Sequence, residues 1–457
     1  TLHRVWLLYL VRRADGGLGV ARRECLSGGL DLSVGNEVRS DSRVTPLGPS
    51  LAWRADGRAL HFLASEHGAT HLWSVEPTGT EEPPQSAAAS PRQDQVRRIS
   101  SQRCWTVAGF TQAAEGSIVV QAGDATHLDE LWLLESEREP GLRRLTAENE
   151  ELFATVQLSL PQRFTFSNRD GWEVEGWLLP PYGFSAGGGG ASWPAVLEIH
   201  GGPHGCWGWT LHTEFQALAA EGYAVVYLNP RGSHSYGQDF VRACIGDWGG
   251  GDFDDLMRGL DAALAANPWL DPERLGVTGN SFGGFMTAWS ISHTARFQTA
   301  VIQGLVADQL SMYGTSDIGY HFNRDELHAT PWAAVYDAEL ETASLSELPA
   351  AAPAIRELPA AREGMQEMLW RSPVWYAEAI HCPVLIIHGE EDHRCPIGQA
   401  EELYTALRIQ GKTAAFARYP GASHVFASGG RPRQRADRLL RVLDWFTAFL
   451  PAGLREP

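Results

Sequence analysis

The sequence of 457 residues predicts an all-β N-terminal portion followed by an α/β domain with a mostly parallel, doubly wound sheet. Two observations support this. Up to about residue 150, short alternating apolar runs are separated by Gly, Pro, Asp and Asn, which is typical of β structure. From about Phe164 onward, apolar strands alternate with amphipathic helices, the pattern of a parallel sheet covered on both faces. We therefore expect a β portion over residues 1–155 and an α/β domain over residues 156–457.

The β portion contains a weak internal repeat. Leu51–Phe62 reads as a strand, a tight Asp-Gly turn and a second strand. Trp6, Trp73 and Trp132 stand in similar short strands, 67 and 59 residues apart, a spacing that favours four-stranded β-propeller blades. Residues 1–155 supply only two or three blades, whereas a closed ring needs at least four. The sequence therefore predicts the last blades of an incomplete ring, as if the beginning were missing, with a generic β sandwich as the alternative.

The α/β part is predicted from its strands and from one well-marked helix. The expected strands are Ala195–Ile199, Tyr223–Leu228, Leu275–Thr278, Thr299–Ile302, Val384–Ile387 and Ala414–Arg418. Apolar side chains recur at helical spacing from Phe253 to Leu264, and Asp252 stands directly before them. We therefore expect a helix with Asp252 as its N-terminal cap.

Composition excludes several classes of function. The 37 basic and 55 acidic residues give a net charge of −18, which disfavours nucleic acid or an anionic membrane as the main partner. No apolar run reaches the roughly 20 residues that span a bilayer. The six cysteines show no paired spacing, which indicates reduced thiols and a cytoplasmic protein. No His or Cys cluster has metal-ligand spacing, so neither a metal nor another cofactor is expected.

The strongest chemical motif is a serine between a strand and a helix. The strand Leu275–Thr278 runs into Gly279-Asn-Ser281-Phe-Gly283, and a helical pattern follows from Phe285. A serine in so sharp a turn needs small neighbours at −2 and +2, because larger side chains would collide with adjacent elements. This context predicts Ser281 as a nucleophile.

A nucleophilic serine needs a base, and the base needs an orienting acid. Downstream, one predicted strand runs into a loop with Asp392, and the next runs into a loop with His424. Ser281, Asp392 and His424 therefore follow the order of an α/β hydrolase, each at the carboxyl end of a strand. Other loop side chains compete for these roles, namely Glu390 and Glu391 as the acid and His388 and His393 as the base. We interpret His388, which ends its strand, as a core residue.

A developing oxyanion needs two backbone N–H donors. Phe282, directly after the serine, supplies one. The segment His200-Gly-Gly-Pro203 follows the first predicted strand of the sheet, and its Gly202 N–H is the candidate for the second. We interpret His200 as a structural support of that loop.

Together these motifs resemble the prolyl oligopeptidase superfamily, and especially its acylaminoacyl-peptidase-like branch. The resemblance spans residues 160 to 450 and is carried by His200–Pro203, Asn229–Ser233, Tyr236-Gly237, Asp247–Gly250, Gly279–Trp289, Tyr313–Asp317, Trp370–Pro373 and His388–Asp392. It implies an α/β-hydrolase domain beneath an N-terminal β-propeller. It also implies a triad of Ser281, Asp392 and His424, with Gly202 and Phe282 as oxyanion donors.

Two positions depart from the family pattern. Asn280 stands before the serine, where relatives in this branch usually have glycine, and Gln303-Gly304 stands where relatives often have Gln-Arg. Losing that arginine puts the polarity of the substrate pocket in doubt. The segment Ala333–Met368, rich in Ala and Glu, is longer than expected and predicts an extra helical insert.

The resemblance implies a serine peptidase that hydrolyses short peptides or N-acyl-aminoacyl peptides through an acyl-enzyme on Ser281, with the propeller restricting substrate size. A carboxylesterase, or a dipeptidyl- or carboxypeptidase on the same scaffold, is the alternative. A scaffold protein with a vestigial hydrolase is disfavoured because all three triad positions are filled. Glu81-Glu82 suits a solvated loop better than the amine clamp of a dipeptidyl peptidase. The expected partners are short peptides, and a homo-oligomer is left open.

Overall fold

The computed structural model describes residues 2–12, 17–42, 51–77, 96–100, 104–134, 141–185, 192–331 and 359–452. Glu81-Glu82 and residues 333–358 of the expected insert lie outside these ranges. The chain divides into two compact units, one of residues 1–190 with 202–242 and one of residues 191–201 with 243–457. No helix among the described residues is long and apolar enough to cross a membrane.

The first unit contains two four-stranded antiparallel meanders. The first comprises β3 (Leu51–Trp53), β4 (Leu60–Glu66), β5 (Ala69–Val75) and β6 (Val96–Arg98), and the second comprises β7 (Thr106–Gln112), β8 (Ile118–Gly123), β9 (Glu130–Leu134) and β10 (Leu142–Arg144). A single parallel bridge, Thr70 to Thr106, joins β5 to β7. Each meander has the strand count and antiparallel pairing of a propeller blade.

The Asp-Gly turn predicted between Leu51 and Phe62 is confirmed. Leu51 pairs with Phe62 and Trp53 with Leu60, so β3 and β4 form a hairpin. Gly57 adopts a φ of +68°, a conformation that side chains other than Gly rarely tolerate. The Asp56 carboxylate accepts hydrogen bonds from the Arg58 backbone N–H at 2.9 Å and from the Arg54 guanidinium. Local turn chemistry therefore sets the register of this hairpin.

The first meander is buried on both faces. Leu63 and Leu72 belong to one apolar cluster with β7 and β8, whereas Phe62 and Trp73 belong to a second cluster with Leu26. Alternate side chains of a strand point to opposite faces, so β4 and β5 separate two apolar layers. A sheet covered in this way resembles a blade packed between neighbours.

The repeat predicted from the tryptophans holds for two of the three. Trp73 lies in the third strand of the first meander and Trp132 in the third strand of the second. Trp6 lies instead in β1 (Trp6–Arg12), which pairs only with β2 (Leu18–Cys25) in a two-stranded sheet. Two blade-like meanders are present among the described residues, joined by the Thr70–Thr106 bridge, and these residues form no closed ring.

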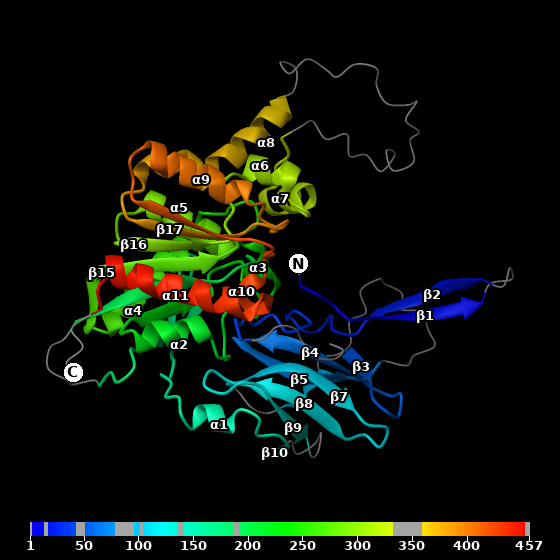
Figure 1. Ribbon diagram of the computed structural model, residues 1–457. Coiled ribbons are helices and arrows are strands. Elements are labelled where there is room, and N and C mark those ends of the chain that lie inside the picture. The colour runs from blue at the N-terminus through cyan, green and yellow to red at the C-terminus, as the bar shows by residue number, and fades with distance from the viewer. Residues whose placement is uncertain are drawn as a thin grey trace. The chain divides into compact units, whose positions relative to one another are not determined.

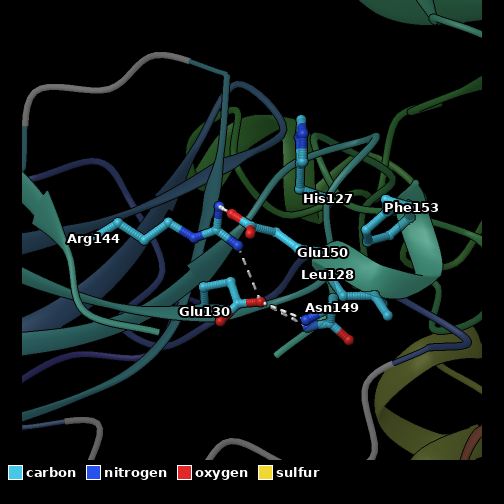
Figure 2. Close-up of a pocket in the computed structure, with 7 residues that line it drawn as sticks. All are labelled: His127, Leu128, Glu130, Arg144, Asn149, Glu150 and Phe153. Carbon is cyan, nitrogen blue, oxygen red and sulfur yellow. Dashed lines mark hydrogen bonds and ion pairs between the residues drawn. The ribbon is translucent and has the colours of Figure 1, made fainter. Parts of the chain in front are cut away.

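Glu130 fixes the chain where it leaves the second meander. Its carboxylate accepts hydrogen bonds from the Thr146 hydroxyl, from the backbone N–H and side-chain amide of Asn149 at 3.0 Å each, and from the Glu148 N–H at 3.2 Å. The Arg144 guanidinium adds an ion pair at 3.3 Å. Glu130, Arg144 and Asn149 line a pocket of about 260 Å³ beside α1 (Glu150–Phe153) (Figure 2).

The rest of the first unit consists of three further strands and two short helices. These are β11 (Gln162–Ser167), β12 (Glu173–Leu179), β14 (Ala224–Leu228), α2 (Thr213–Ala220) and α3 (Gln238–Arg242). Strands β11 and β14 pair antiparallel with β12. The expected strand Tyr223–Leu228 is therefore present as β14.

The second unit is built on a parallel sheet, as expected. Its strands, in spatial order, are β13 (Trp193–Ile199), β15 (Leu270–Asn280), β16 (Thr299–Gln303), β17 (Val384–Gly389) and β18 (Ala414–Tyr419). The helices are α4 (Gly251–Ala266), α5 (Phe282–His293), α6 (Gln309–Thr315), α7 (Gly319–Leu327), α8 (Pro359–Trp370), η4 (Pro373–Ala379), α9 (Gly398–Ile409), α10 (Phe426–Gly429) and α11 (Pro432–Phe449).

Helices lie on both sides of these strands (Figure 1). Thr299 and Gln303 are four residues apart on β16, so their side chains lie on the same face of the strand. Both contact α11: Thr299 accepts a hydrogen bond from Trp445 at 2.9 Å, and Gln303 accepts one from Arg438 at 2.6 Å. Helices α5 and α9 both pack against η4. The doubly wound arrangement predicted from strand–helix alternation is therefore present around this parallel sheet.

The predicted cap of α4 is wrong. The residue before the helix is Gly250, and the carboxylate that accepts from the first helical N–H, that of Gly251, belongs to Asp247, at 2.8 Å. Asp252 lies inside the first turn, is fully buried, and has a pKa raised to about 7, chiefly by burial. The apolar stripe nonetheless packs inward around Leu256 and Leu260. The helical periodicity therefore predicted the helix correctly. Asp252, however, faces the protein interior and not the end of the helix.

Candidate active site

Ser281 lies at the sharp turn between β15 and α5. It adopts a φ of +64° and a ψ of −120°, an uncommon conformation for a residue with a side chain. Its N–H donates to the Gln303 carbonyl at 3.0 Å, and its carbonyl accepts from the Phe285 N–H at 2.9 Å. Hydrogen bonds on both sides therefore hold the strained serine in place.

The two glycines that flank the serine are required by close packing. A Cβ on Gly279 would lie 2.6 Å from the Ile199 carbonyl oxygen, and one on Gly283 would lie 2.0 Å from the same atom. Neither distance is sterically tolerable. The prediction that positions −2 and +2 must be small is confirmed, because β13 passes directly beside the turn.

Asp392 lies in the loop that follows β17. Its Oδ1 accepts hydrogen bonds from the backbone N–H groups of Arg394 at 3.0 Å and Cys395 at 2.8 Å. Its Oδ2 lies 2.7 Å from His424 Nδ1. Two backbone donors thus orient the carboxylate so that its second oxygen faces the imidazole.

His424 follows β18 and joins the other two side chains. Its Nε2 lies 2.9 Å from Ser281 Oγ, and its Nδ1 faces Asp392. Because the carboxylate only accepts, Nδ1 carries the proton, and Nε2 of the neutral ring is free to accept the serine proton. The structure brings together the three residues selected from the sequence.

The electrostatics of the acid favour its ionised form. Burial alone would raise the pKa of Asp392, but hydrogen bonds from His388 and His424 outweigh it and hold the pKa well below its usual range. The carboxylate is therefore charged at neutral pH and stabilises an imidazolium beside it.

His388 does more than fill the core. It is fully buried, as expected, and its Nε2 donates to the Cys395 carbonyl at 2.7 Å while lying 3.4 Å from Asp392 Oδ2. It therefore orders the turn that carries the acid. Of the competing acids, Glu390 instead pairs with Arg418 at 2.9 Å. The His393 carbonyl accepts from the Asp317 backbone N–H at 2.9 Å.

Phe282 follows Ser281 directly in the chain, and Gly201 of the glycine loop passes close to the serine. The N–H of Phe282 opens α5, and its ring packs edge-on against Trp248 at 4.8 Å. Gly201 passes so close to the serine that a Cβ there would lie 3.2 Å from the Ser281 Cβ. Gly202, the next residue, belongs to the first unit, and its role as a donor stays a prediction.

The two departures from the family pattern meet beside the imidazole. Gly304 follows β16 with a φ of +50°, and a Cβ there would lie 3.1 Å from Asn280 Nδ2. The same Cβ would lie 3.6 Å from His424 Cε1. A glycine at position 304 therefore leaves room for the Asn280 side chain and for the imidazole edge.

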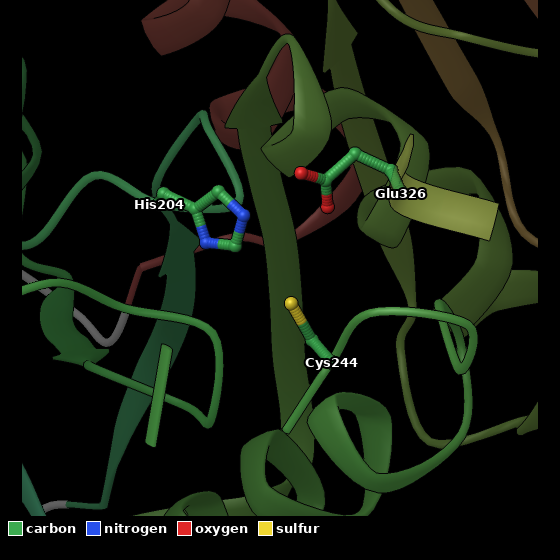
Figure 3. Close-up of side chains that lie close together, drawn as sticks. All are labelled: His204, Cys244 and Glu326. Atoms are coloured by element: carbon green, nitrogen blue, oxygen red, sulfur yellow. The ribbon is translucent and has the colours of Figure 1, made fainter. Parts of the chain in front are cut away.

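Cys244 does not compete as a nucleophile. Burial raises the pKa of its thiol well above the usual value, and the carboxylates of Asp252 and Glu326 raise it further. Figure 3 shows the Cys244 thiol and the Glu326 carboxylate. A thiol with a raised pKa stays protonated at neutral pH and is a poor nucleophile.

Known proteins match most of this chain. Among curated proteins, "Uncharacterized peptidase YuxL" of Bacillus subtilis is 34% identical over 98% of this chain and 60% of its own length. "Probable dipeptidyl-peptidase 5" of Emericella nidulans is 27% identical over 62% of this chain and 35% of its own length. The chain thus spans about three-fifths or less of these relatives.

A solved structure matches at the level of fold. Pyrococcus horikoshii acylaminoacyl peptidase superposes with a TM-score of 0.74 and 25% identity, over 96% of this chain and 58% of that one. The family model described as "Prolyl oligopeptidase family" matches residues 209–452, more than half of the chain, and this range contains all three residues of the site. The chain therefore belongs to the prolyl oligopeptidase family.

Proposed function

We propose that this chain carries the catalytic site of a serine peptidase that hydrolyses short peptides or N-acyl-aminoacyl peptides through an acyl-enzyme on Ser281. The observation that supports this best is the continuous hydrogen-bonded relay from Asp392 through His424 to Ser281 Oγ, at 2.7 and 2.9 Å. Family membership supports peptide hydrolysis as the reaction.

In the first half of the proposed reaction, His424 Nε2 takes the proton of Ser281 Oγ as the oxygen attacks the substrate carbonyl carbon. The carbonyl π electrons move to its oxygen, which the N–H groups of Phe282 and Gly202 would stabilise. The tetrahedral intermediate then collapses. The C–N bond breaks, and the proton on Nε2 passes to the leaving amine.

In the second half, His424 accepts a proton from water, and the resulting nucleophile attacks the acyl carbon. Collapse of this intermediate returns the proton to Ser281 Oγ and releases the acid. Throughout, Asp392 keeps the ring in the tautomer that presents Nε2 to the serine, and it stabilises the charged imidazolium.

The substrate class is proposed from the relatives and not from the triad. The solved structure named an acylaminoacyl peptidase supports N-acylated substrates, whereas the fungal relative named a dipeptidyl-peptidase supports dipeptides released from a free amino end. A carboxylesterase remains the third candidate, because the same triad hydrolyses activated esters. The predicted role of the β portion as a size filter, the domain boundary at residues 155 and 156, a cytoplasmic location and self-association also remain proposals.

A fluorophosphonate probe tests the nucleophile. We expect covalent labelling of the parent protein at Ser281 and none of the Ser281→Ala variant. Mass spectrometry of the labelled peptide locates the adduct. Absence of label on a folded parent, or a label on a different residue, would contradict the proposal.

A substrate panel then ranks the three activities. It compares an N-acetyl-aminoacyl anilide, a dipeptidyl anilide with a free amino end and a p-nitrophenyl ester at matched concentrations. A higher kcat/KM for the acetylated anilide than for its free-amine counterpart supports the leading candidate, and hydrolysis of the ester alone favours the esterase. A ten-residue peptide compared with a folded protein, each with this chain and with a longer one, tests the size filter.

A further inference from the structure

The glycine loop that carries Gly202 is bonded to a segment near the beginning of the chain, residues 37–39, which we call the anchor segment. Both belong to the first unit. A parallel β-bridge joins the anchor segment to Cys206. The Cys206 N–H donates to the Glu37 carbonyl at 3.2 Å, and the Cys206 carbonyl accepts from the Arg39 N–H at 2.9 Å. The backbone a few residues beyond Gly202 is therefore held on both sides.

The Glu37 side chain adds a second attachment. Its carboxylate is 12% exposed, and Oε2 lies 3.1 Å from Nδ1 of the buried His234 ring. The backbone N–H of His234 donates to the Gly205 carbonyl at 3.2 Å, and its ring stacks on that of His204 with the centroids 5.7 Å apart. Through His234, the Glu37 carboxylate thus supports the two residues that follow Gly202-Pro in the loop.

Burial and the neighbouring imidazoles set the charges in this contact. Burial alone would raise the pKa of Glu37, but His234 and His3 outweigh it and hold that pKa well below its usual range. Burial lowers the pKa of His234, and the carboxylate offsets this only in part. At neutral pH the contact therefore joins a carboxylate to a neutral imidazole. Because a carboxylate only accepts, Nδ1 carries the proton that faces it.

A displacement of the loop would reach the reaction through Gly202. A Cβ on Gly202 would lie 2.4 Å from the His204 nitrogen and 2.5 Å from the Gly205 nitrogen, so the loop folds back tightly on itself. One peptide bond joins Gly202 to Gly201, where a Cβ would lie 3.2 Å from the Ser281 Cβ. The support of the loop and the approach to the serine are therefore adjacent in the chain.

We propose that Glu37 is a positioning residue, which holds the glycine loop so that the Gly202 N–H meets the developing oxyanion. This inference rests on the proposed function and adds to it a support for the oxyanion donor. Such a donor acts in the transition state and not in substrate binding. Glu37→Ala should therefore lower kcat by about tenfold to a hundredfold, because a misplacement of about 1 Å has an effect of that size. KM should stay within about twofold.

A matched pair of inhibitors separates this role from a general structural one. With a peptidyl trifluoromethyl ketone, Ser281 Oγ bonds to the carbonyl carbon, the π electrons move to the carbonyl oxygen, and the serine proton passes to His424 Nε2. The adduct therefore carries an oxyanion. The corresponding alcohol has no carbonyl and only occupies the same site. Glu37→Ala should weaken the ketone by the same factor as kcat/KM and leave the Ki of the alcohol within about twofold.

Two variants at the same carboxylate serve as controls in the full chain. Glu37→Gln keeps an oxygen that can accept from His234 and should retain at least about a third of kcat. His3→Gln breaks the other imidazole contact of Glu37, which joins His3 Nδ1 to Oε1 at 3.1 Å. The His3 side chain is 68% exposed and lies apart from the loop contact, so kcat should stay within about twofold.

Asp41→Ala is the control for stability. The Asp41 carboxylate accepts from the N–H groups of Thr213 at 2.7 Å and Glu214 at 2.8 Å, at the start of α2. Its loss should lower the thermal midpoint, as the loss of a helix cap does, without lowering kcat. If Glu37→Ala does not fold, His234→Leu removes the same contact from the loop side. His234→Asn, which keeps a side-chain N–H near the position of Nδ1, should then retain a higher kcat than His234→Leu.

The inference fails in any of three cases. In the first, Glu37→Ala, or both His234 variants in its place, keeps the kcat of an active parent. In the second, the ketone and the alcohol weaken by the same factor, which would make Glu37 a support of the whole substrate site. In the third, kcat falls only in proportion to the loss of folded protein. A folded parent that takes no fluorophosphonate at Ser281 would instead overturn the proposed function, and this inference with it.

Discussion

Glu130 in the first unit and Asp392 in the second are both buried carboxylates with a lowered pKa, yet they serve different ends. Burial would raise the pKa of Glu130, but bonds from Thr146 and Asn149 lower it to about 2. For Asp392, the bonds that lower the pKa come chiefly from two imidazoles. The groups around Glu130 are a hydroxyl, a side-chain amide, backbone N–H groups and the Arg144 guanidinium. In contrast, one imidazole beside Asp392 reaches a serine hydroxyl.

A depressed pKa therefore does not by itself mark a catalytic acid. The two carboxylates differ in their hydrogen-bond partners. Only a partner such as an imidazole, which binds the carboxylate through one nitrogen, can gain and lose a proton at its other nitrogen. His424 can, because Nε2 faces Ser281 Oγ. The groups around Glu130 do not connect it to a second proton-accepting side chain, so its charge stabilises a turn. The comparison predicts that neutralising Asp392 affects turnover, and neutralising Glu130 affects folding.

The largest expected effect is that of Ser281→Ala. Turnover should fall by several orders of magnitude with the fold intact, because the covalent step is lost. The sharper test is the double variant Ser281→Ala/Asp392→Asn, which should be no slower than Ser281→Ala alone. Single-turnover assays on a peptide anilide measure both. A further large loss in the double variant would mean that Asp392 acts on something other than the serine.

Asp392→Asn should lower kcat by about ten-thousandfold, as expected when an amide stabilises the wrong imidazole tautomer. Far-ultraviolet circular dichroism should match the parent, because the Asn oxygen can still accept from the turn. If the variant keeps kcat within tenfold, Glu390 or Glu391 is the working acid. Glu390→Gln and Glu391→Gln serve as the controls.

Glu130→Gln should leave kcat unchanged and lower the free energy of unfolding by about 2 kcal/mol at pH 7, because an amide nitrogen would face backbone donors. Since the folded pKa lies below the unfolded value of 4.5, the stabilisation is present above pH 4.5 and fades toward about pH 2. The gap between parent and variant should therefore close over that interval in urea titrations. The exposed Glu148→Gln is the matched control, and a gap that stays constant with pH would contradict this account.

The smallest effect is expected at Asp252, a third buried carboxylate. Its pKa is raised from 3.8 to about 7, mainly by burial, so the folded state loses stability as the pH rises from about 4 to about 7. Asp252→Asn should gain stability relative to the parent between about pH 4 and pH 8, by at least about 1 kcal/mol. Thermal midpoints at the two pH values measure this, with the exposed Asp254→Asn as the control. A larger gain at pH 4 than at pH 8 would reverse the sign and refute the account.

The sharp turn at Ser281 could be predicted because the residues that constrain it are close in the sequence. Gly279 and Gly283 are both within two residues of Ser281, and each is required by contact with a neighbouring strand. The acid and base could be predicted because the carboxyl ends of parallel strands meet at one edge of a sheet. The geometry of Ser281, Asp392 and His424 agrees with that expectation.

The supporting contacts could not be predicted in the same way. Asp317 and Arg394, which form an ion pair at 2.8 Å, are separated by 77 residues, and no spacing in the sequence pairs them. The end of its strand indicates a core role for His388, whereas its spacing of four from Asp392 across a tight turn is the signal for the contact between them. The cap at Asp252 failed because a polar residue beside an apolar stripe can face the core. Strand patterns likewise gave the two blade-like sheets but cannot show whether a ring closes.

The double-sided burial of β4 and β5 has a consequence for the order of synthesis. One of their apolar layers is completed by residues made earlier, such as Leu26, whereas the other includes residues as late as Leu134. At about 5–20 residues per second, that second layer stays open for roughly 3 to 12 seconds after Val75 leaves the ribosome. We expect nascent chains arrested in this interval to bind a chaperone or to be cut within β4 and β5. Chains in which Leu134 has emerged should be protected at the same sites.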